Sequence, residues 1–124
     1  MPAQKVLVVD DEAPARERVK ALIGKIDGFT TVAEASNGEQ ALQYNTEHAP
    51  DIVLLDIRMP GMDGLEVARH LATRTRPPVV IFCTAFDEHA LAAFDAQAIG
   101  YLLKPLRLEQ LEKVLQRAQQ VNSG

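Results

Sequence analysis

Short runs of apolar residues recur along the chain, and each run is rich in Val, Ile or Leu. The runs cover Lys5–Val9, Thr31–Ala35, Ile52–Leu55, Val79–Thr84 and Tyr101–Leu103. Continuous apolar runs of this length are typical of strands that are buried on both faces of a sheet. The pattern therefore predicts five strands.

The segments between and after these runs place their inward-facing residues at helical spacing. These positions are Ala15, Val19, Leu22, Ile23 and Ile26; Ala41, Leu42 and Asn45; Leu65, Ala68, Leu71 and Ala72; Leu91 and Phe94; and Leu108, Leu111, Leu115 and Ala118. Pro14 suits the first turn of the first segment. Asn37 and Asp63 each precede a Gln or Glu by three residues, as at a capped helix start. We therefore expect five helices.

Strict alternation of strands and helices predicts an α/β fold. Right-handed crossovers between parallel strands place the helices on both faces of the sheet, which gives a doubly wound architecture. The length of 124 residues is that of one domain. We expect a single domain over residues 1–124, with no second domain in the chain.

Composition narrows the classes of function. The net charge of −4 provides no basic surface for nucleic acid, so DNA contact would need a domain that this chain lacks. No apolar stretch approaches the length of a membrane span, and the first residues show no signal-peptide pattern. Cys83 is the single cysteine and lies in an apolar run, which fits a reducing compartment. A cytoplasmic location is expected.

Acidic residues directly follow two of the predicted strands. Asp10 and Asp11 follow the first run, and Asp56 follows the third. Ligands of doubly wound sheets bind beyond the carboxyl ends of the strands, so these carboxylates should meet at one edge. Clustered like charges are unfavourable unless a cation binds them, and oxygen ligands without a nearby histidine favour Mg²⁺. For each Asp alone, a helix cap or an exposed strand end is the simpler interpretation.

Residues at two further strand ends favour a shared site over this simpler interpretation. Thr84 closes the fourth run and Lys104 follows the fifth, which adds a hydroxyl and an ammonium group to the same edge. A carboxylate nucleophile, a metal, a cation and a hydroxyl are what phosphoryl transfer to a protein requires. The five positions together favour a phosphoacceptor site over the simpler interpretation.

The motifs that carry these residues resemble those of response-regulator receiver domains over essentially the whole chain. They read VLVVDDE, IVLLDIRMPGMDG, FCTAF and YLLKPL in chain order. The resemblance implies a flavodoxin-like sheet of order 2-1-3-4-5. It also implies a two-component switch that accepts a phosphoryl group from a sensor histidine kinase. Such a domain is not an enzyme beyond its own phosphorylation and dephosphorylation.

Residue by residue, the resemblance makes Asp56 the phosphoacceptor and Asp11 a direct metal ligand. Asp10 would position the metal, and the Arg58 carbonyl would also bind it. Thr84 and Lys104 would hold phosphoryl oxygens. Two further positions match the family: Tyr101 would be the aromatic residue that turns inward when Thr84 moves, and the Lys104-Pro105 peptide would be cis, which is accessible to X-Pro bonds.

The stretch from Phe82 to Leu106 also resembles LytTR-type transcriptional regulators, in which a receiver precedes a DNA-binding domain. Gly100 and Arg107 depart from the family, because an acid and a small capping residue are common at these positions. The resemblance implies an output surface on the fourth helix, fifth strand and fifth helix. Apolar residues on that surface would support homodimerisation on phosphorylation.

Two other functions compete with this interpretation. A magnesium phosphohydrolase of the haloacid-dehalogenase type also uses an aspartyl phosphate, but its Asp-x-Asp pattern is missing, because Ile57 and Arg58 follow Asp56. A receiver-like module that signals without phosphate would normally lack part of the acidic set.

Gly61 and Gly64, in the turn after Asp56, are expected to supply unusual backbone angles. The histidines are assigned no role.

Overall fold

The computed structural model describes residues 2–85 and 98–123. Its strands are β1 (Gln4–Val9), β2 (Phe29–Ala35), β3 (Ile52–Leu55), β4 (Val79–Thr84) and β5 (Gly100–Leu103). Its helices are α1 (Ala13–Ile23), α2 (Gly38–His48), α3 (Gly64–Ala72) and α5 (Leu108–Ser123). The predicted helix around Leu91 and Phe94 lies outside the described residues. None of the described helices combines the length and apolar character that a membrane span requires.

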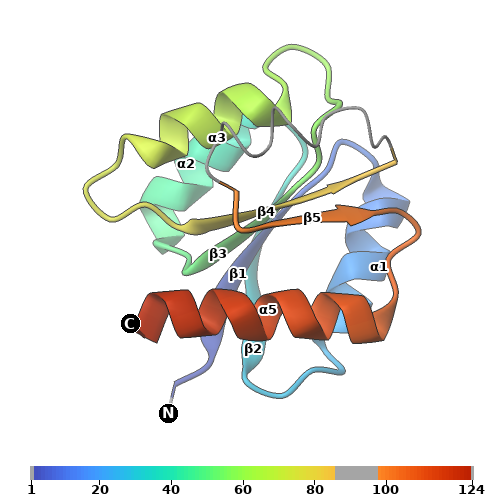
Figure 1. The fold of residues 1–124 in the computed structure, drawn as a ribbon. Helices are drawn as coiled ribbons and strands as arrows, with labels where there is room; N and C mark the ends of the chain where they lie inside the picture. The colour runs from blue at the N-terminus through green and yellow to red at the C-terminus, as the bar shows by residue number, and fades with distance from the viewer. Residues whose placement is uncertain (1, 86–97, 124) are drawn as a thin grey trace.

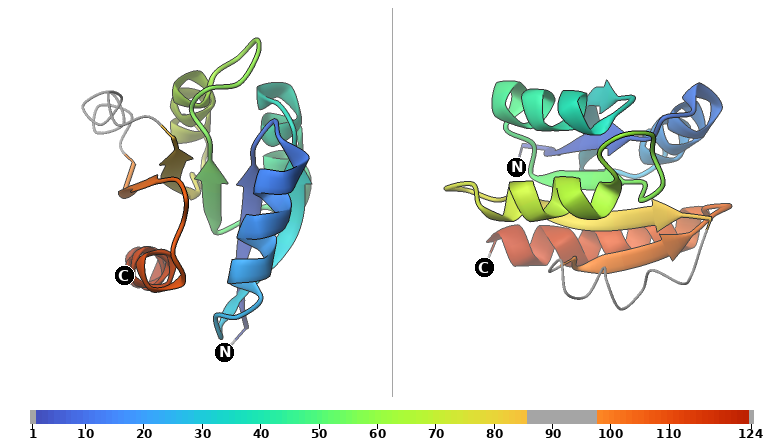
Figure 2. Two further views of the ribbon diagram at one scale, coloured as in Figure 1. Left: turned by 90° about the vertical axis from the view of Figure 1, so that its right-hand side faces the viewer. Right: turned by 90° about the horizontal axis from the view of Figure 1, so that it is seen from above.

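The strands form one parallel sheet of order β2-β1-β3-β4-β5, as the resemblance implies. Helices α1 and α5 cover one face of the sheet, and α2 and α3 cover the other (Figures 1 and 2). The chain crosses from one face to the other between α1 and α2. Strands β1 and β3 are neighbours although β2 separates them in sequence, so their carboxyl ends flank the point where the connections diverge.

The core has two layers because successive side chains of a strand point to opposite faces. Val6 and Val8 of β1 pack with α1 and α5, whereas Leu7 and Val9 pack with α2 and α3. All four of these side chains are almost completely buried. This burial on both faces explains why the strand sequences are continuously apolar rather than alternating.

Four predicted boundaries differ from the observed ones. Strand β1 begins at Gln4 rather than Lys5, β2 begins at Phe29 rather than Thr31, and β5 begins at Gly100 rather than Tyr101. Helix α1 ends at Ile23, because Gly24 is a poor helix former, although Ile26 still packs into the core from the turn that follows. Pairing with neighbouring strands, which no local pattern reports, extends these three strands at their amino ends.

The predicted helix starts at Asn37 and Asp63 are confirmed. The Asn37 side chain accepts a hydrogen bond from the Gln40 amide at 2.8 Å, and Asp63 accepts one from the Glu66 amide at 2.9 Å. Each bond satisfies one amide that the helix cannot pair internally. These caps fix where α2 and α3 begin after their loops.

Close contact with α5 explains why a glycine occupies position 100. A Cβ atom there would lie 2.4 Å from Cγ2 of Val114 on α5. The Val114 side chain thus packs closely against the backbone at the start of β5, and a larger residue at position 100 would require it to move. This departure from the family lies away from the acidic edge of the sheet.

Candidate functional site

The carboxylates predicted to meet at the carboxyl edge of the sheet do so. One oxygen from each of Asp10, Asp11 and Asp56 lies within 4.8 Å of the other two. Asp10 and Asp56 are buried, and Asp11 is exposed. The site therefore has a buried floor of two carboxylates and a third carboxylate at its mouth.

Lys104 lies between the two buried carboxylates. Its Nζ donates to Oδ2 of Asp10 at 2.6 Å and to Oδ2 of Asp56 at 3.2 Å. The backbone of Lys104 is held in place, because its amide donates a hydrogen bond to the Thr84 carbonyl at 2.8 Å. One ammonium thus offsets part of the negative charge of the cluster and stands beside Asp56.

Opposing influences act on the ionisation of the buried groups. Burial raises the pKa of the Asp56 carboxyl, and the nearby Asp10 charge raises it further, against the lowering effect of Lys104. Burial works to lower the pKa of Lys104, but its hydrogen bond to Asp10 and the charges of both carboxylates raise it on balance. A further cation at Asp56 would favour its ionised form.

Thr84 ends β4 beside these charges and is fully buried. Its hydroxyl oxygen has no hydrogen-bond partner within the described part of the chain. An unpaired buried hydroxyl is unfavourable, so its presence in a native protein requires an explanation. A ligand oxygen bound at this edge of the sheet would provide the missing partner.

The donor set fits a magnesium ion. Mg²⁺ binds carboxylate and carbonyl oxygens and retains several waters, which suits a cluster with one exposed carboxylate. The Thr84 hydroxyl, which is unpaired among the described residues, adds a place for a bound oxyanion beside the cation. The site is therefore suited to a divalent ion together with a phosphoryl group.

The other predicted residues lie on the loop after β3 and on or just after β5. Arg58 is exposed on the loop after β3, where a hollow of about 490 Å³ adjoins it. Tyr101 is half-buried on β5, with its ring centroid 6.5 Å from that of Phe82. The Lys104-Pro105 peptide is cis.

The loop after Asp56 requires glycine for two different reasons. Gly61 adopts a φ of 77°, in the left-handed region, and so has the unusual backbone angle that was expected. The expectation for Gly64 was wrong, because Gly64 has no positive φ. A Cβ atom at Gly64 would lie 2.1 Å from the Asp56 carbonyl oxygen, so this glycine lets the start of α3 pass against the backbone of the site.

Replacing Gly64 with Ala is expected to lower the free energy of unfolding by about 3 kcal/mol, because the clash involves backbone that cannot move without displacing Asp56. Gly24→Ala is the control, since a Cβ there would meet its nearest neighbours at 3.5 Å and φ is −61°. That variant should be unchanged or slightly more stable. Urea denaturation of both variants measures the difference, and an equally stable Gly64→Ala protein would contradict it.

Reasoning from sequence missed one contact to the acidic loop. Arg16 donates from Nη1 to the main-chain carbonyl of Asp10 at 2.8 Å. Its only sequence signal is its place on the first turns of the helix that follows the acidic pair. A long side chain can point in many directions, so the sequence offered no way to choose this acceptor.

Comparison with known proteins identifies the relatives of this fold and site. The model of the response regulator receiver domain family matches residues 6–116. The positive alginate biosynthesis regulatory protein of Pseudomonas aeruginosa is 56% identical over 94% of this chain and 48% of its own length. The sensory transduction protein LytT of Bacillus subtilis is 35% identical over 95% of this chain and 49% of its own. The chain thus spans about half the length of these relatives.

Solved structures give the same relationship. The signal receiver domain of NarL from Mycobacterium tuberculosis superposes with a TM-score of 0.88 at 36% identity. The match covers 96% of this chain and 98% of that domain. Both the fold and the order of the strands are therefore shared with receiver domains of known structure.

Proposed function

This chain belongs to the response regulator receiver family, and from that premise we propose that Asp56 accepts a phosphoryl group from a sensor histidine kinase in a magnesium-dependent reaction. The observation that supports the proposal most directly is the grouping of Asp10, Asp11 and Asp56 within 4.8 Å. Lys104 reaches two of these carboxylates.

In the proposed reaction, an oxygen of Asp56 attacks phosphorus as the bond from phosphorus to the kinase histidine nitrogen breaks. The nitrogen keeps the electron pair, and the new bond forms an acyl phosphate. Lys104 stands within reach of the phosphoryl oxygens, because Asp10 holds its ammonium 3.2 Å from Asp56. The Thr84 hydroxyl, which has no other partner within the described residues, donates to another of these oxygens.

The metal would be held by the carboxylates of Asp11 and Asp56 and by the Arg58 carbonyl, with Asp10 positioning it. When bound, Mg²⁺ supplies positive charge that neutralises the transferring phosphoryl group. Asp11 is suited to first capture of the ion because it is the exposed member of the cluster.

The chain is a regulatory domain of a two-component system. We propose that it catalyses no reaction other than its own phosphorylation and dephosphorylation, and that it works in the cytoplasm with its kinase. Incubation with Mg²⁺ and a small phosphodonor should yield acid-labile, hydroxylamine-sensitive phosphate on Asp56. Steady release of phosphate from many donors would indicate a phosphohydrolase, and no labelling at all would indicate a module that signals without phosphate.

We further propose that the chain controls a DNA-binding domain in a longer protein of the LytTR type. Its relatives include transcriptional regulators about twice its length, such as BtsR of Salmonella typhi, of which it covers 49%. The output surface would comprise β5, α5 and the predicted helix around Leu91, and it would support homodimerisation. Leu103 is 46% exposed on β5 and provides an apolar contact there.

Phosphorylation is expected to draw Thr84 and Lys104 toward the phosphoryl oxygens and to let Tyr101 turn inward. Backbone NMR shifts from His89 to Leu111 should therefore change when Mg²⁺ and a phosphodonor are added. Residues of α2, such as Gln43, should change little. Unchanged shifts across residues 89–111 in a fully phosphorylated sample would contradict this route of signalling.

A further inference from the structure

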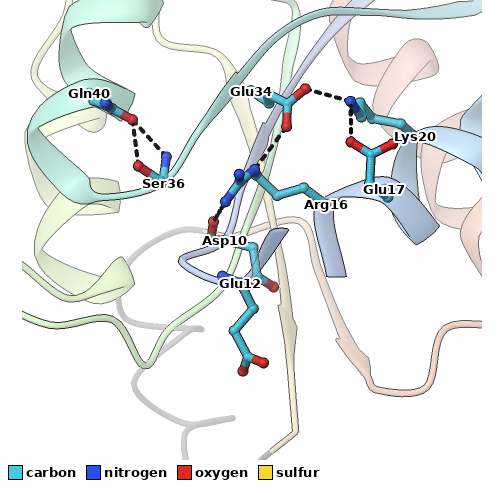
Figure 3. A network of polar contacts seen from close by, with 8 residues as sticks. All are labelled: Asp10, Glu12, Arg16, Glu17, Lys20, Glu34, Ser36 and Gln40. Carbon is cyan, nitrogen blue, oxygen red and sulfur yellow. Dashed lines mark hydrogen bonds and ion pairs between the residues drawn. The ribbon is translucent and has the colours of Figure 1, made fainter. Parts of the chain in front are cut away.

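The side chain of Arg16 links the acidic loop to the neighbouring strand. From α1, its Nη1 donates to the Asp10 carbonyl at 2.8 Å and its Nε donates to Oε1 of Glu34 on β2, also at 2.8 Å. Figure 3 shows the guanidinium between the two acceptors. Only 17% of the Arg16 side chain is exposed. Two nitrogens of the guanidinium group thus donate at the same time, and the side chain is largely enclosed.

The loop that Arg16 reaches lacks the usual anchor of a helix start. Glu12 is the N-cap of α1, yet its side chain makes no capping hydrogen bond, and Pro14 in the first turn has no amide hydrogen to donate. Within the loop, the Glu12 amide donates to Oδ1 of Asp10 at 2.9 Å. The Arg16 bond is the one described side-chain contact that ties the Asp10 carbonyl to a structure outside the loop.

The Asp10 carbonyl belongs to the same planar peptide unit as the Asp11 nitrogen. Fixing that carbonyl therefore limits the directions that Asp11 can take. Asp11 needs such a restraint, because it is exposed and its carboxylate is repelled by the two buried ones. We infer that Arg16 is a positioning residue that holds the acidic loop in its metal-binding arrangement, and this inference rests on the proposed magnesium site.

The sign of the effect separates positioning from simple electrostatics. Arg16 is a cation near the cluster, so electrostatics alone predict that its removal would make a second cation bind more tightly. Loss of positioning predicts weaker binding, because residues that orient metal ligands typically contribute about 10- to 100-fold to affinity. If Mg²⁺ binds more weakly when Arg16 is absent, the change therefore cannot be a charge effect.

Lys20 offers a matched control on the same helix. It lies one turn after Arg16 and donates to Oε2 of the same Glu34 at 2.5 Å, with a second contact to Glu17 at 2.8 Å (Figure 3). No described contact joins it to the acidic loop. Lys20→Met thus removes the same charge and a bond to the same carboxylate, while it leaves the Asp10 carbonyl held.

The test is a titration of each folded protein with Mg²⁺ alone by isothermal calorimetry. Arg16→Met is expected to raise the Mg²⁺ Kd about tenfold, and Lys20→Met should leave it near the wild-type value. Arg16→Lys should recover part of the loss, because an ammonium group can hold one acceptor but cannot reproduce the fork. At saturating Mg²⁺, labelling of Arg16→Met by a small phosphodonor should approach that of the wild type. If Arg16→Met does not fold, Arg16→Gln replaces it.

The outcomes distinguish this inference from the proposed function. Equal or tighter Mg²⁺ binding by the folded Arg16 variants, beside normal binding by the wild type, would overturn the positioning role alone. A wild-type protein that bound no Mg²⁺ would overturn both. An equal loss in Lys20→Met would show that the ion pairs to Glu34, rather than the bond to the Asp10 carbonyl, are responsible, and would also overturn the inference.

Discussion

Asp56→Asn is expected to carry no acid-labile phosphate after incubation with Mg²⁺ and a phosphodonor under conditions that label the wild-type chain. The amide is nearly the same size as the carboxylate, but it offers no anionic oxygen to attack phosphorus. Mass spectrometry of the intact protein, with hydroxylamine treatment, measures the loss. Phosphate that persisted at another residue of the variant would contradict the assignment of Asp56.

Asp63→Asn is the matched control for this substitution. It removes the same unit of charge from the loop after β3, and asparagine replaces aspartate well as the N-cap of α3. The control should be labelled to the wild-type extent. Loss of labelling in both variants would indicate disruption of the loop instead of loss of the nucleophile.

Asp56→Asn is also expected to change the stability of the fold in a way that depends on pH. Burial raises the pKa of Asp56 in the folded state, above the ordinary value of 3.8. Stability linked to this group is therefore fully present below that ordinary value and is lost as the pH rises through the folded pKa. Without Mg²⁺, the Tm of Asp56→Asn should exceed that of the wild type at neutral pH, and the difference should shrink as the pH falls toward 3.8.

Asp11→Ala is expected to weaken Mg²⁺ binding by more than about 100-fold, since even residues that only orient ligands contribute 10- to 100-fold. In the wild type, Mg²⁺ at about 100 times its Kd should stabilise the fold by roughly 2.7 kcal/mol and raise the Tm. The variant should show little of this rise, although its Tm without metal should be at least that of the wild type, because a like charge has been removed.

Glu12→Gln serves as the control for Asp11→Ala. Glu12 is the next acid in the chain, but the group of carboxylates within 4.8 Å comprises Asp10, Asp11 and Asp56 alone among the described residues. Its removal should leave the Tm rise caused by Mg²⁺ nearly intact. Equal Mg²⁺ binding by Asp11→Ala and the wild type would exclude Asp11 as a ligand.

Features that depend on neighbours along the chain could be predicted from the sequence. The apolar runs predicted β3 and β4 to the residue, because a strand buried on both faces must be continuously apolar. The caps at Asn37 and Asp63 were readable because a capping side chain bonds an amide three residues away. The acids at the strand ends indicated one site, since parallel strands share a carboxyl edge.

Contacts between residues that are distant in sequence could not be predicted in this way, because they depend on how the elements pack. Lys104 and Asp10 are separated by 94 positions, yet their side-chain atoms lie 2.6 Å apart. The need for glycine at position 64 came from the Asp56 carbonyl behind it, and the acceptors of Arg16 came from the loop and β2 together. Local patterns fix which residues enter an element, but the distances between side chains are set by the packing of elements against one another. For this protein, the sequence therefore identified the chemical groups of the site, and the fold determined which of them touch.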